Sequence, residues 1–252
     1  MKAKKHFGQH FLTSTDTAKH IVLQLGKLEE LKVLEIGPGT GIITQFMVDQ
    51  CKAFKAVEID REAQDYLENK FDSIELLKGD FLKMDIKSLF ISPFSLIGNF
   101  PYNISSQIVF KIIENCEVIT QWVGMFQLEM GLRLLATPKD KKTYGILSAL
   151  LPFYYKLEKV IKLPPGAFNP PPKVHSIVIK ATKVEYELKC SPKLLKQVIK
   201  AAFGQRRKTL ANSISSIVPK EVFNQHQFAN LRAENLTHLQ FEELCCFIEG
   251  NV

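Results

Sequence analysis

The segment Asn99-Phe100-Pro101-Tyr102 holds the residue types best suited to a specific reaction in this 252-residue chain. It directly follows the apolar run 94–98, which is typical of a buried strand. The Asn side-chain oxygen and a backbone carbonyl can both accept hydrogen bonds from one exocyclic amino group, while the Tyr ring stacks on a planar base. With a methyl donor nearby, these residues would form the centre of an amino-methyltransferase. Alone, Asn-X-Pro after a strand is equally typical of a turn.

A glycine-rich loop, Gly37-Pro38-Gly39-Thr40-Gly41, follows an earlier expected strand. Its glycines let the backbone turn tightly and approach a ligand closely. The dinucleotide fingerprint G-x-G-x-x-G needs a further glycine where this chain has Ile42. The spacing, with Glu35 just before it, instead suits a nucleoside whose charged end is an amino acid.

Two acids, Glu58 and Asp80, follow the next two expected strands. Glu58 stands 21 residues after Gly37, where a carboxylate can accept hydrogen bonds from both ribose hydroxyls. Asp80 is placed to accept a hydrogen bond from an adenine amino group. Either acid could instead cap a helix. Because the loop and both acids stand at successive strand ends, S-adenosylmethionine is the cofactor that these residues fit best.

The elements that position these motifs alternate between strands and helices. Strands are expected at 32–37, 54–60, 73–78, 94–99 and 122–126, and helices at 42–50, 61–70, 104–115 and 129–136. This alternation predicts an α/β fold with a parallel sheet and helices on both faces. Ligands should bind beyond the carboxyl ends of the strands, where the motifs fall.

The rest of the chain predicts a second domain. Two further strands, 153–163 and 174–182, are expected to complete the sheet of the first domain, and they flank a stiff proline-rich loop at 164–172. The remaining pattern is helical, at 191–203, 206–217, 219–229 and 237–249. We therefore expect a methyltransferase domain over 1–185 and a small all-helical domain over 186–252.

Composition favours a globular protein with a polyanionic partner. Hydrophobic residues make up 46% of the chain and charged residues 23%, and the formal net charge is +7. Five cysteines without a C-x-x-C pair indicate neither a disulfide framework nor a zinc site, and no metal is expected. The chain has no run of eighteen apolar residues, which argues against a membrane span. A reducing cytoplasm is the expected compartment.

Charge is segregated along the chain. Lys2, Lys4 and Lys5 precede the first acid, and no acid occurs between Lys189 and Lys220. A nucleic-acid-binding surface requires such segregation.

The chain resembles the small-subunit ribosomal RNA adenine dimethyltransferases, and the wider group that includes the erythromycin-resistance methylases. The resemblance covers nearly the whole chain and rests on residues 8–12, 33–41, 57–61, 79–82, 99–105, 165–176 and 206–210. It implies a Rossmann-like methyltransferase sheet. It also implies that S-adenosylmethionine is contacted by His10, Leu12 (through its backbone), Gly37, Glu58, Asp80 and Asn99, and the loop spacing adds Gly39.

Two residues depart from the family pattern. Phe100 replaces the usual Leu or Ile and could alter the pocket wall, although its role is expected to come from its backbone carbonyl. Leu128 stands where a Lys is common.

The expected mechanism needs neither a metal nor a covalent enzyme intermediate. The Asn99 side chain and the Phe100 carbonyl accept the two hydrogens of the adenine amino group, with Pro101 stiffening the backbone between them and Tyr102. Tyr102 and Phe168 are the candidates for the two faces of a base sandwich. The alternative for Phe168 is a core anchor that holds the proline-rich loop. His10 is expected to be a structural or ligand-contacting residue and not a base.

RNA phosphates are expected to bind the basic residues of the helical domain: Lys193, Lys196, Lys200, Arg206, Arg207 and Lys208. The alternative is a solvated helix face. The partner would be small-subunit ribosomal RNA or a precursor of the small subunit, bound by a monomer.

The leading hypothesis is an enzyme that dimethylates two adjacent adenosines near the 3′ end of small-subunit ribosomal RNA during subunit maturation. Its rivals are a resistance-type methylase that acts on large-subunit RNA and an assembly factor without essential chemistry. A nicotinamide oxidoreductase is disfavoured by Ile42.

Overall fold

The computed structural model describes residue 4 and residues 8–251, so Lys2 and Lys5 of the basic N-terminal segment lie outside the described residues. The chain divides into two units: residues 1–131 with 156–183, and residues 132–155 with 184–252. The last passage of the chain from the first unit to the second, at 183–184, falls close to the boundary expected near residue 185. The segment 132–155 differs from that expectation, because it groups with the C-terminal helices.

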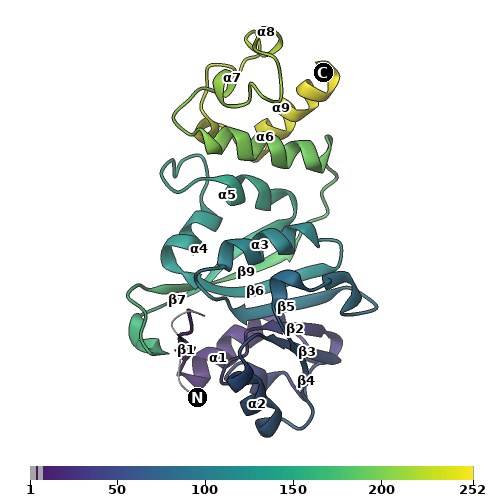
Figure 1. Cartoon of the computed structure of the whole chain (residues 1–252), viewed down its shortest axis with the longest axis vertical. Helices are drawn as coiled ribbons and strands as arrows, with labels where there is room; N and C mark the ends of the chain where they lie inside the picture. The colour runs from purple at the N-terminus through teal and green to yellow at the C-terminus, as the bar shows by residue number, and fades with distance from the viewer. Residues whose placement is uncertain (1–3, 5–7, 252) are drawn as a thin grey trace. The chain divides into compact units, whose positions relative to one another are not determined.

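A seven-stranded sheet forms the centre of the first unit in the described part of the chain (Figure 1). Its strand order is β4-β3-β2-β5-β6-β9-β7. The strands are β2 (Lys32–Ile36), β3 (Ala53–Glu58), β4 (Glu75–Lys78), β5 (Phe94–Asn99), β6 (Ile119–Gln127), β7 (Tyr155–Leu163) and β9 (Ser176–Lys183). The pairs from β4 to β6 are parallel, whereas β6 and β9 are antiparallel. The expected α/β, Rossmann-like class is confirmed.

The central strands are buried on both faces, which explains their continuous apolar sequences. Leu34 of β2 and Leu96 of β5 are inaccessible to solvent. Since β5 lies between β2 and β6, its last residue, Asn99, is held at the middle of the sheet's carboxyl edge.

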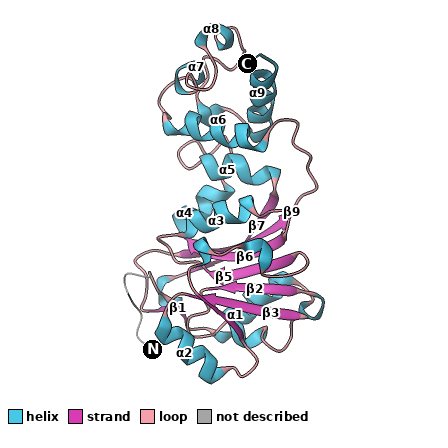
Figure 2. Ribbon diagram, turned by 45° about the vertical axis from the view of Figure 1, so that its right-hand side comes forward, coloured by secondary structure: helices cyan, strands magenta, loops and turns pink. Residues whose placement is uncertain are grey.

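The helices of this unit lie on both faces of the sheet, with α1 (Thr15–Val22) and α3 (Ser105–Glu114) on opposite sides (Figure 2). The unit also contains α2 (Arg61–Lys70) and the start of α4 (Leu128–Leu135). The helix expected at 42–50 is wrong, since this stretch forms turns around a short 3-10 helix, η4 (Thr44–Phe46). The β-branched run Ile42-Ile43-Thr44 has low helix propensity.

A small second sheet connects the N-terminal segment to the proline-rich loop. Strand β1 (Phe11–Leu12) pairs antiparallel with β8 (Phe168–Asn169). The loop also contains the 3-10 helix η8 (Pro165–Ala167), and the Asn169–Pro170 peptide bond is cis. The pairing of β8 with β1 and this 3-10 helix give the loop a defined structure, as its proline content predicts.

The second unit is helical. Its helices are α5 (Ile146–Leu150), α6 (Pro192–Gly204), α7 (Leu210–Ser213), α8 (Lys220–Phe223) and α9 (His238–Asn251). The expected helices 206–217 and 219–229 are shortened to α7 and α8. Polar side chains compete for the backbone there, as when the Ser215 hydroxyl donates to the Asn212 carbonyl. Within the described residues, no helix has the length and apolarity needed to span a membrane.

Candidate active site

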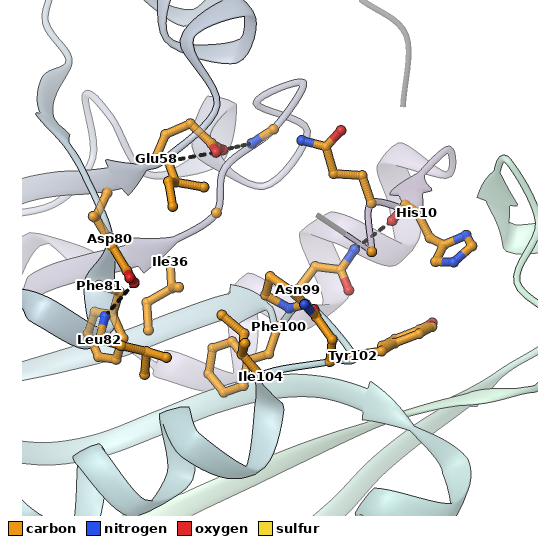
Figure 3. A pocket seen from close by; sticks show the side chains of 18 of the residues that line it. His10, Ile36, Glu58, Asp80, Phe81, Leu82, Asn99, Phe100, Tyr102 and Ile104 are labelled. Carbon is orange, nitrogen blue, oxygen red and sulfur yellow. Dashed lines mark hydrogen bonds between the residues drawn. The ribbon is translucent and has the colours of Figure 1, made fainter. Parts of the chain in front are cut away.

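A cavity of about 210 Å³ opens at the carboxyl edge of β2, β3 and β5 in the first unit (Figure 3). Its walls come from residues 8–11, the glycine-rich loop, the ends of β3 and β4, and the segment 99–104. Most of the predicted site residues thus meet in one place. The parallel strands cause this convergence, because they all end at the same edge.

Glu58, the last residue of β3, is held by backbone donors. Its Oε1 accepts hydrogen bonds from the N–H groups of Ile59 and Asp60, both at 2.9 Å, and its Oε2 accepts from Gly39 at 3.2 Å. The side chain is 5% exposed, and this burial raises the pKa of its carboxyl above the usual range. An ionised carboxylate has about four acceptor positions, so one remains for a ligand hydroxyl.

The glycine-rich loop needs its glycines for two different reasons. Gly37 and Gly39 have φ angles of 65° and 57°, which side-chain-bearing residues rarely adopt. An added Cβ at Gly39 would also lie 2.8 Å from the Phe11 ring, whereas at Gly37 it would meet nothing within 4 Å. The space over Gly37 is therefore open to a ligand, while Gly39 is where the N-terminal segment contacts the loop.

Asp80 is both a cap and a cavity residue. Its Oδ1 accepts a hydrogen bond from the Leu82 N–H at 2.9 Å and thereby caps the 3-10 helix η5 (Phe81–Lys83). The two interpretations of the sequence are thus compatible, because the cap aligns a carboxylate that lines the cavity.

Asn99 is oriented by the backbone of His10. Its Nδ2 donates a hydrogen bond to the His10 carbonyl at 2.8 Å, as Figure 3 shows. Because this bond uses the amide nitrogen, the Asn99 oxygen is left as the acceptor for a ligand. The sequence did not reveal this bond between residues 89 positions apart.

The large ring of Phe100 is directed into the core. It is 0% exposed and makes an edge-to-face contact with Phe126 at 5.2 Å between ring centroids. Gly98 and Gly124, which are paired across β5 and β6, provide the space: an added Cβ on either would lie 3.0 Å or less from this ring. The departure at Phe100 is therefore accommodated by two glycines.

Tyr102 is fixed at both its hydroxyl and its ring. The hydroxyl shares a hydrogen bond of 2.7 Å with Ser176, and burial raises the pKa of the phenol. The His10 ring is stacked on it, with centroids 5.3 Å apart and planes inclined by 26°. His10 Nδ1 also lies 2.8 Å from the Pro170 oxygen, so this histidine contacts the proline-rich loop as well.

Leu12 and Phe168 do not line the cavity. Each is 3% exposed, they face each other across the β1–β8 pair, and both belong to the hydrophobic cluster. The stacking predicted for Phe168 is not available in this arrangement, which corresponds to the alternative of a core anchor. The pairing of two short strands turned both side chains inward.

The apolar walls of the cavity were not predicted from the sequence. Ile59, Phe81, Leu82 and Ile104 line it, and Ile59 is 47% exposed beside Glu58. An apolar residue directly after each predicted ligand-binding acid was the signal that could have identified the first two.

The predicted RNA-binding residues lie in the second unit. Lys193 and Lys200 of α6, together with Arg207 and Lys208, are exposed, whereas Lys196 and Arg206 are half-buried. The Arg206 guanidinium donates to Glu234 at 3.0 Å and also to the Lys141 carbonyl. Arg206, which follows the end of α6, therefore holds the lysine-containing segment 139–142, a contact that the sequence alone did not reveal. No group of three His, Cys, Asp or Glu side chains in the described residues could hold a metal ion.

Comparisons with known proteins agree with this geometry. The family model described as "Ribosomal RNA adenine dimethylase" matches residues 1–249. Ribosomal RNA small subunit methyltransferase A of Bacteroides thetaiotaomicron is 45% identical over 254 residues, which cover 99% of this chain and 95% of that protein. The protein of the same name from Porphyromonas gingivalis is 43% identical and covers 99% and 98%.

Solved structures are similar in fold. A dimethyladenosine transferase from Plasmodium falciparum has a TM-score of 0.81 at 25% identity, covering 96% of this chain and 98% of that chain. The 23S rRNA methyltransferase ErmE has a TM-score of 0.66 at 23% identity, covering 93% and 99%. The second likeness is one of fold alone.

Proposed function

The chain belongs to the ribosomal RNA adenine dimethylase family, and from this premise we propose its reaction in detail. It transfers methyl groups from S-adenosylmethionine to the N6 amino groups of two adjacent adenosines near the 3′ end of small-subunit ribosomal RNA. The family match over residues 1–249 and the names of relatives that are 41–45% identical support this substrate. The observation that carries the chemistry is the Asn99 amide, whose nitrogen is already bound to the His10 carbonyl.

The residues of the cavity fit the proposed cofactor. The remaining acceptor position of Glu58 suits a ribose hydroxyl, and the second carboxylate oxygen of Asp80 suits an adenine amino group. The open space over Gly37 suits the amino-acid end. When bound, S-adenosylmethionine supplies an electrophilic methyl group.

Asn99 and Phe100 would orient the adenine amino group. The nitrogen of that group is a poor nucleophile, because its lone pair is delocalised into the ring. The Asn99 oxygen accepts one of its hydrogens and the Phe100 carbonyl accepts the other, which favours a pyramidal nitrogen. These residues act by position and local electrostatics.

Pro101 and Tyr102 would hold the base. Pro101 restricts the backbone, and its carbonyl accepts a hydrogen bond from Ile104 at 3.2 Å, which closes the turn. The Tyr102 ring is held by Ser176 and offers a stacking surface worth roughly 1–3 kcal/mol per base. That amount offsets much of the few kcal/mol needed to unstack a base.

The second unit would bind RNA phosphates. The exposed cations Lys193, Lys200, Arg207 and Lys208 are suited to this, and Lys196 adds to the same helix. Arg206 contributes indirectly, since its guanidinium already binds Glu234 and the Lys141 carbonyl.

One experiment tests the proposed reaction against its rivals. The protein is incubated with labelled S-adenosylmethionine and either unmethylated small subunits or large subunits, and the digested RNA is analysed for modified nucleosides. We expect N6,N6-dimethyladenosine in the small subunit only. Label in the large subunit would favour a resistance-type methylase, and cofactor binding without any dimethyladenosine would favour an assembly factor.

A further inference from the structure

Lys111 is a lysine inside the first unit that the proposed reaction does not use. It stands on α3, which begins three residues after Tyr102, and does not line the cavity. Its Nζ donates hydrogen bonds to two backbone carbonyls on another segment, that of Leu82 at 2.8 Å and that of Met84 at 2.6 Å. Both carbonyls belong to the turn that follows Asp80.

The same ammonium group also contacts the ring beside it. Lys111 Nζ lies 5.5 Å from the centroid of the Phe81 ring, within the range of a cation–π interaction. Phe81 is buried, and desolvation lowers the pKa of Lys111 below its usual value. A partly desolvated cation binds its acceptors more strongly than an exposed one.

The contacts of Lys111 continue to the cavity through the turn. Leu82, whose carbonyl accepts from Lys111, donates its own N–H to Asp80 Oδ1. Asp80, Phe81 and Leu82 all line the cavity wall opposite Asn99 and Tyr102, as Figure 3 shows. One lysine thus links the helix that follows the catalytic segment to the turn that carries Asp80.

We propose that Lys111 is a positioning residue for the cofactor: by binding the Leu82 and Met84 carbonyls, it holds the turn 80–84 in the conformation that receives the adenine end of S-adenosylmethionine. The inference rests on the proposed function, because it takes this cavity as the cofactor site. It assigns Lys111 to cofactor affinity and not to the handling of the target base.

Four variants test this role. Lys111→Met removes the donor and keeps the aliphatic stem, and Lys111→Arg keeps a cation with several donors. Lys111→Gln has a shorter neutral donor, and it takes the place of Lys111→Met if the Met variant does not fold. The matched control is Lys83→Met, which removes an exposed lysine from the same turn.

Three readouts are measured. The first is the Kd of each variant for S-adenosylmethionine and for S-adenosylhomocysteine. The second is the backbone hydrogen exchange of residues 79–86 without cofactor. The third is kcat and KM on small subunits. Lys111→Met should raise both Kd values about tenfold, a loss of about 1.4 kcal/mol, and should accelerate exchange in this segment.

Turnover by Lys111→Met, and the cofactor affinities of the other three variants, should change less than the cofactor affinity of Lys111→Met. With Lys111→Met, kcat at saturating cofactor and KM for the subunit should stay within about twofold of the original values. Lys111→Arg should restore most of the affinity, Lys111→Gln should lie between Met and Arg, and Lys83→Met should change nothing.

Three outcomes separate this inference from the proposed function. Suppose that the unmodified protein methylates the subunit, while a folded Lys111→Met variant (or Lys111→Gln in its place) has unchanged Kd values and unchanged exchange. This result overturns the role of Lys111 and leaves the proposed function standing. So does a fall in kcat at constant Kd. If the unmodified protein binds neither S-adenosylmethionine nor S-adenosylhomocysteine, the proposed function is contradicted, and this inference with it.

Discussion

At the scale of single residues, the site depends on side chains whose partners lie far away in sequence. The Asn99 amide is aligned by the His10 carbonyl, and one carboxylate oxygen of Glu58 accepts a hydrogen bond from the backbone N–H of Gly39. The sequence predicted which residues take part, because their types and strand-end positions are local information. It could not predict these bonds, since they depend on how separate segments meet.

The first prediction concerns Asn99. Because its oxygen is the oriented acceptor, Asn99→Ala should lower kcat by about a hundredfold or more, in the range seen when a single stabilising polar group is removed from an active site. The cofactor Kd should change by less than about threefold. Single-turnover methylation and isothermal titration measure the two quantities, with the exposed Asn69→Ala as the control. Equal turnover in both variants would remove Asn99 from the mechanism.

The second prediction concerns Phe100, whose proposed role uses only its backbone carbonyl. Phe100→Leu should retain activity within about threefold, because the carbonyl stays. It should lower the free energy of unfolding by roughly 1–2 kcal/mol, since it leaves a void over Gly98 and Gly124. Urea unfolding and kcat measured on the same preparation separate the effects. A large loss of activity at unchanged stability would contradict this division.

The third prediction concerns Glu35, which is buried and accepts a hydrogen bond from the Thr44 hydroxyl at 2.7 Å. Burial raises the pKa of its carboxyl from 4.5 to about 8. Between these values the folded protein keeps a proton that the unfolded chain has released. The contribution of Glu35 to stability is therefore greatest below pH 4.5 and is lost as the pH rises to about 8.

Glu35→Gln should remove this dependence, because an amide does not ionise. Relative to the original protein, its free energy of unfolding should increase with pH up to about pH 8 and then level off, with a limiting slope of about 1.4 kcal/mol per pH unit. Unfolding curves across this interval measure the difference. The exposed Glu29→Gln is the control, and a pH-independent difference for Glu35→Gln would contradict the assignment.

At the scale of elements, the agreement between sequence and structure follows the strength of the local pattern. The bounds of β5 and α2 match the expected 94–99 and 61–70, since one is a continuous apolar run and the other is capped by Asp60. The helix at 42–50 did not form, because three β-branched residues outweighed its apolar spacing. The short β1 and β8 could not be predicted, since each is defined only by its pairing with the other.

The fourth prediction concerns the packing between β5 and β6. An added Cβ at Gly124 would lie 2.6 Å from the Phe100 ring and 2.7 Å from the Phe126 ring. Gly124→Ala should therefore destabilise the protein by about 1–3 kcal/mol, a typical cost of overpacking. Combining it with Phe100→Leu should cost less than the sum of the two single changes, because the smaller side chain relieves the clash. Strict additivity in a double-mutant cycle would contradict this account of Phe100.

At the scale of the whole molecule, the chain has two units with different features. The first contains a cavity that has polar and apolar walls, and the second is helical and rich in exposed cations. The α/β class and the all-helical C-terminal part were predictable from the change in pattern near residue 185. The assignment of residues 132–155 to the helical unit was not, because it depends on contacts such as that between Arg206 and Lys141.

The fifth prediction concerns RNA affinity. Replacing Lys193, Arg207 and Lys208 together with Ala should weaken binding to the small subunit and reduce the slope of log K against log salt by roughly two to three. Cofactor Kd should not change. The control replaces three exposed lysines of the other parts of the chain, Lys19, Lys52 and Lys156. A slope equal to that of the control would show that these cations form a solvated helix face and do not bind RNA phosphates.

The most direct test of the central claim is to map the methyl groups on the RNA. Small subunits that lack the modification are treated with the protein and S-adenosylmethionine, and the 3′-terminal RNA fragment is sequenced by mass spectrometry. We predict two methyl groups on each of two adjacent adenosines near the 3′ end, and methylation that is slower by about a hundredfold or more with the Asn99→Ala variant at the same enzyme concentration. Methyl groups at any other position, or equal methylation by that variant, would contradict the account.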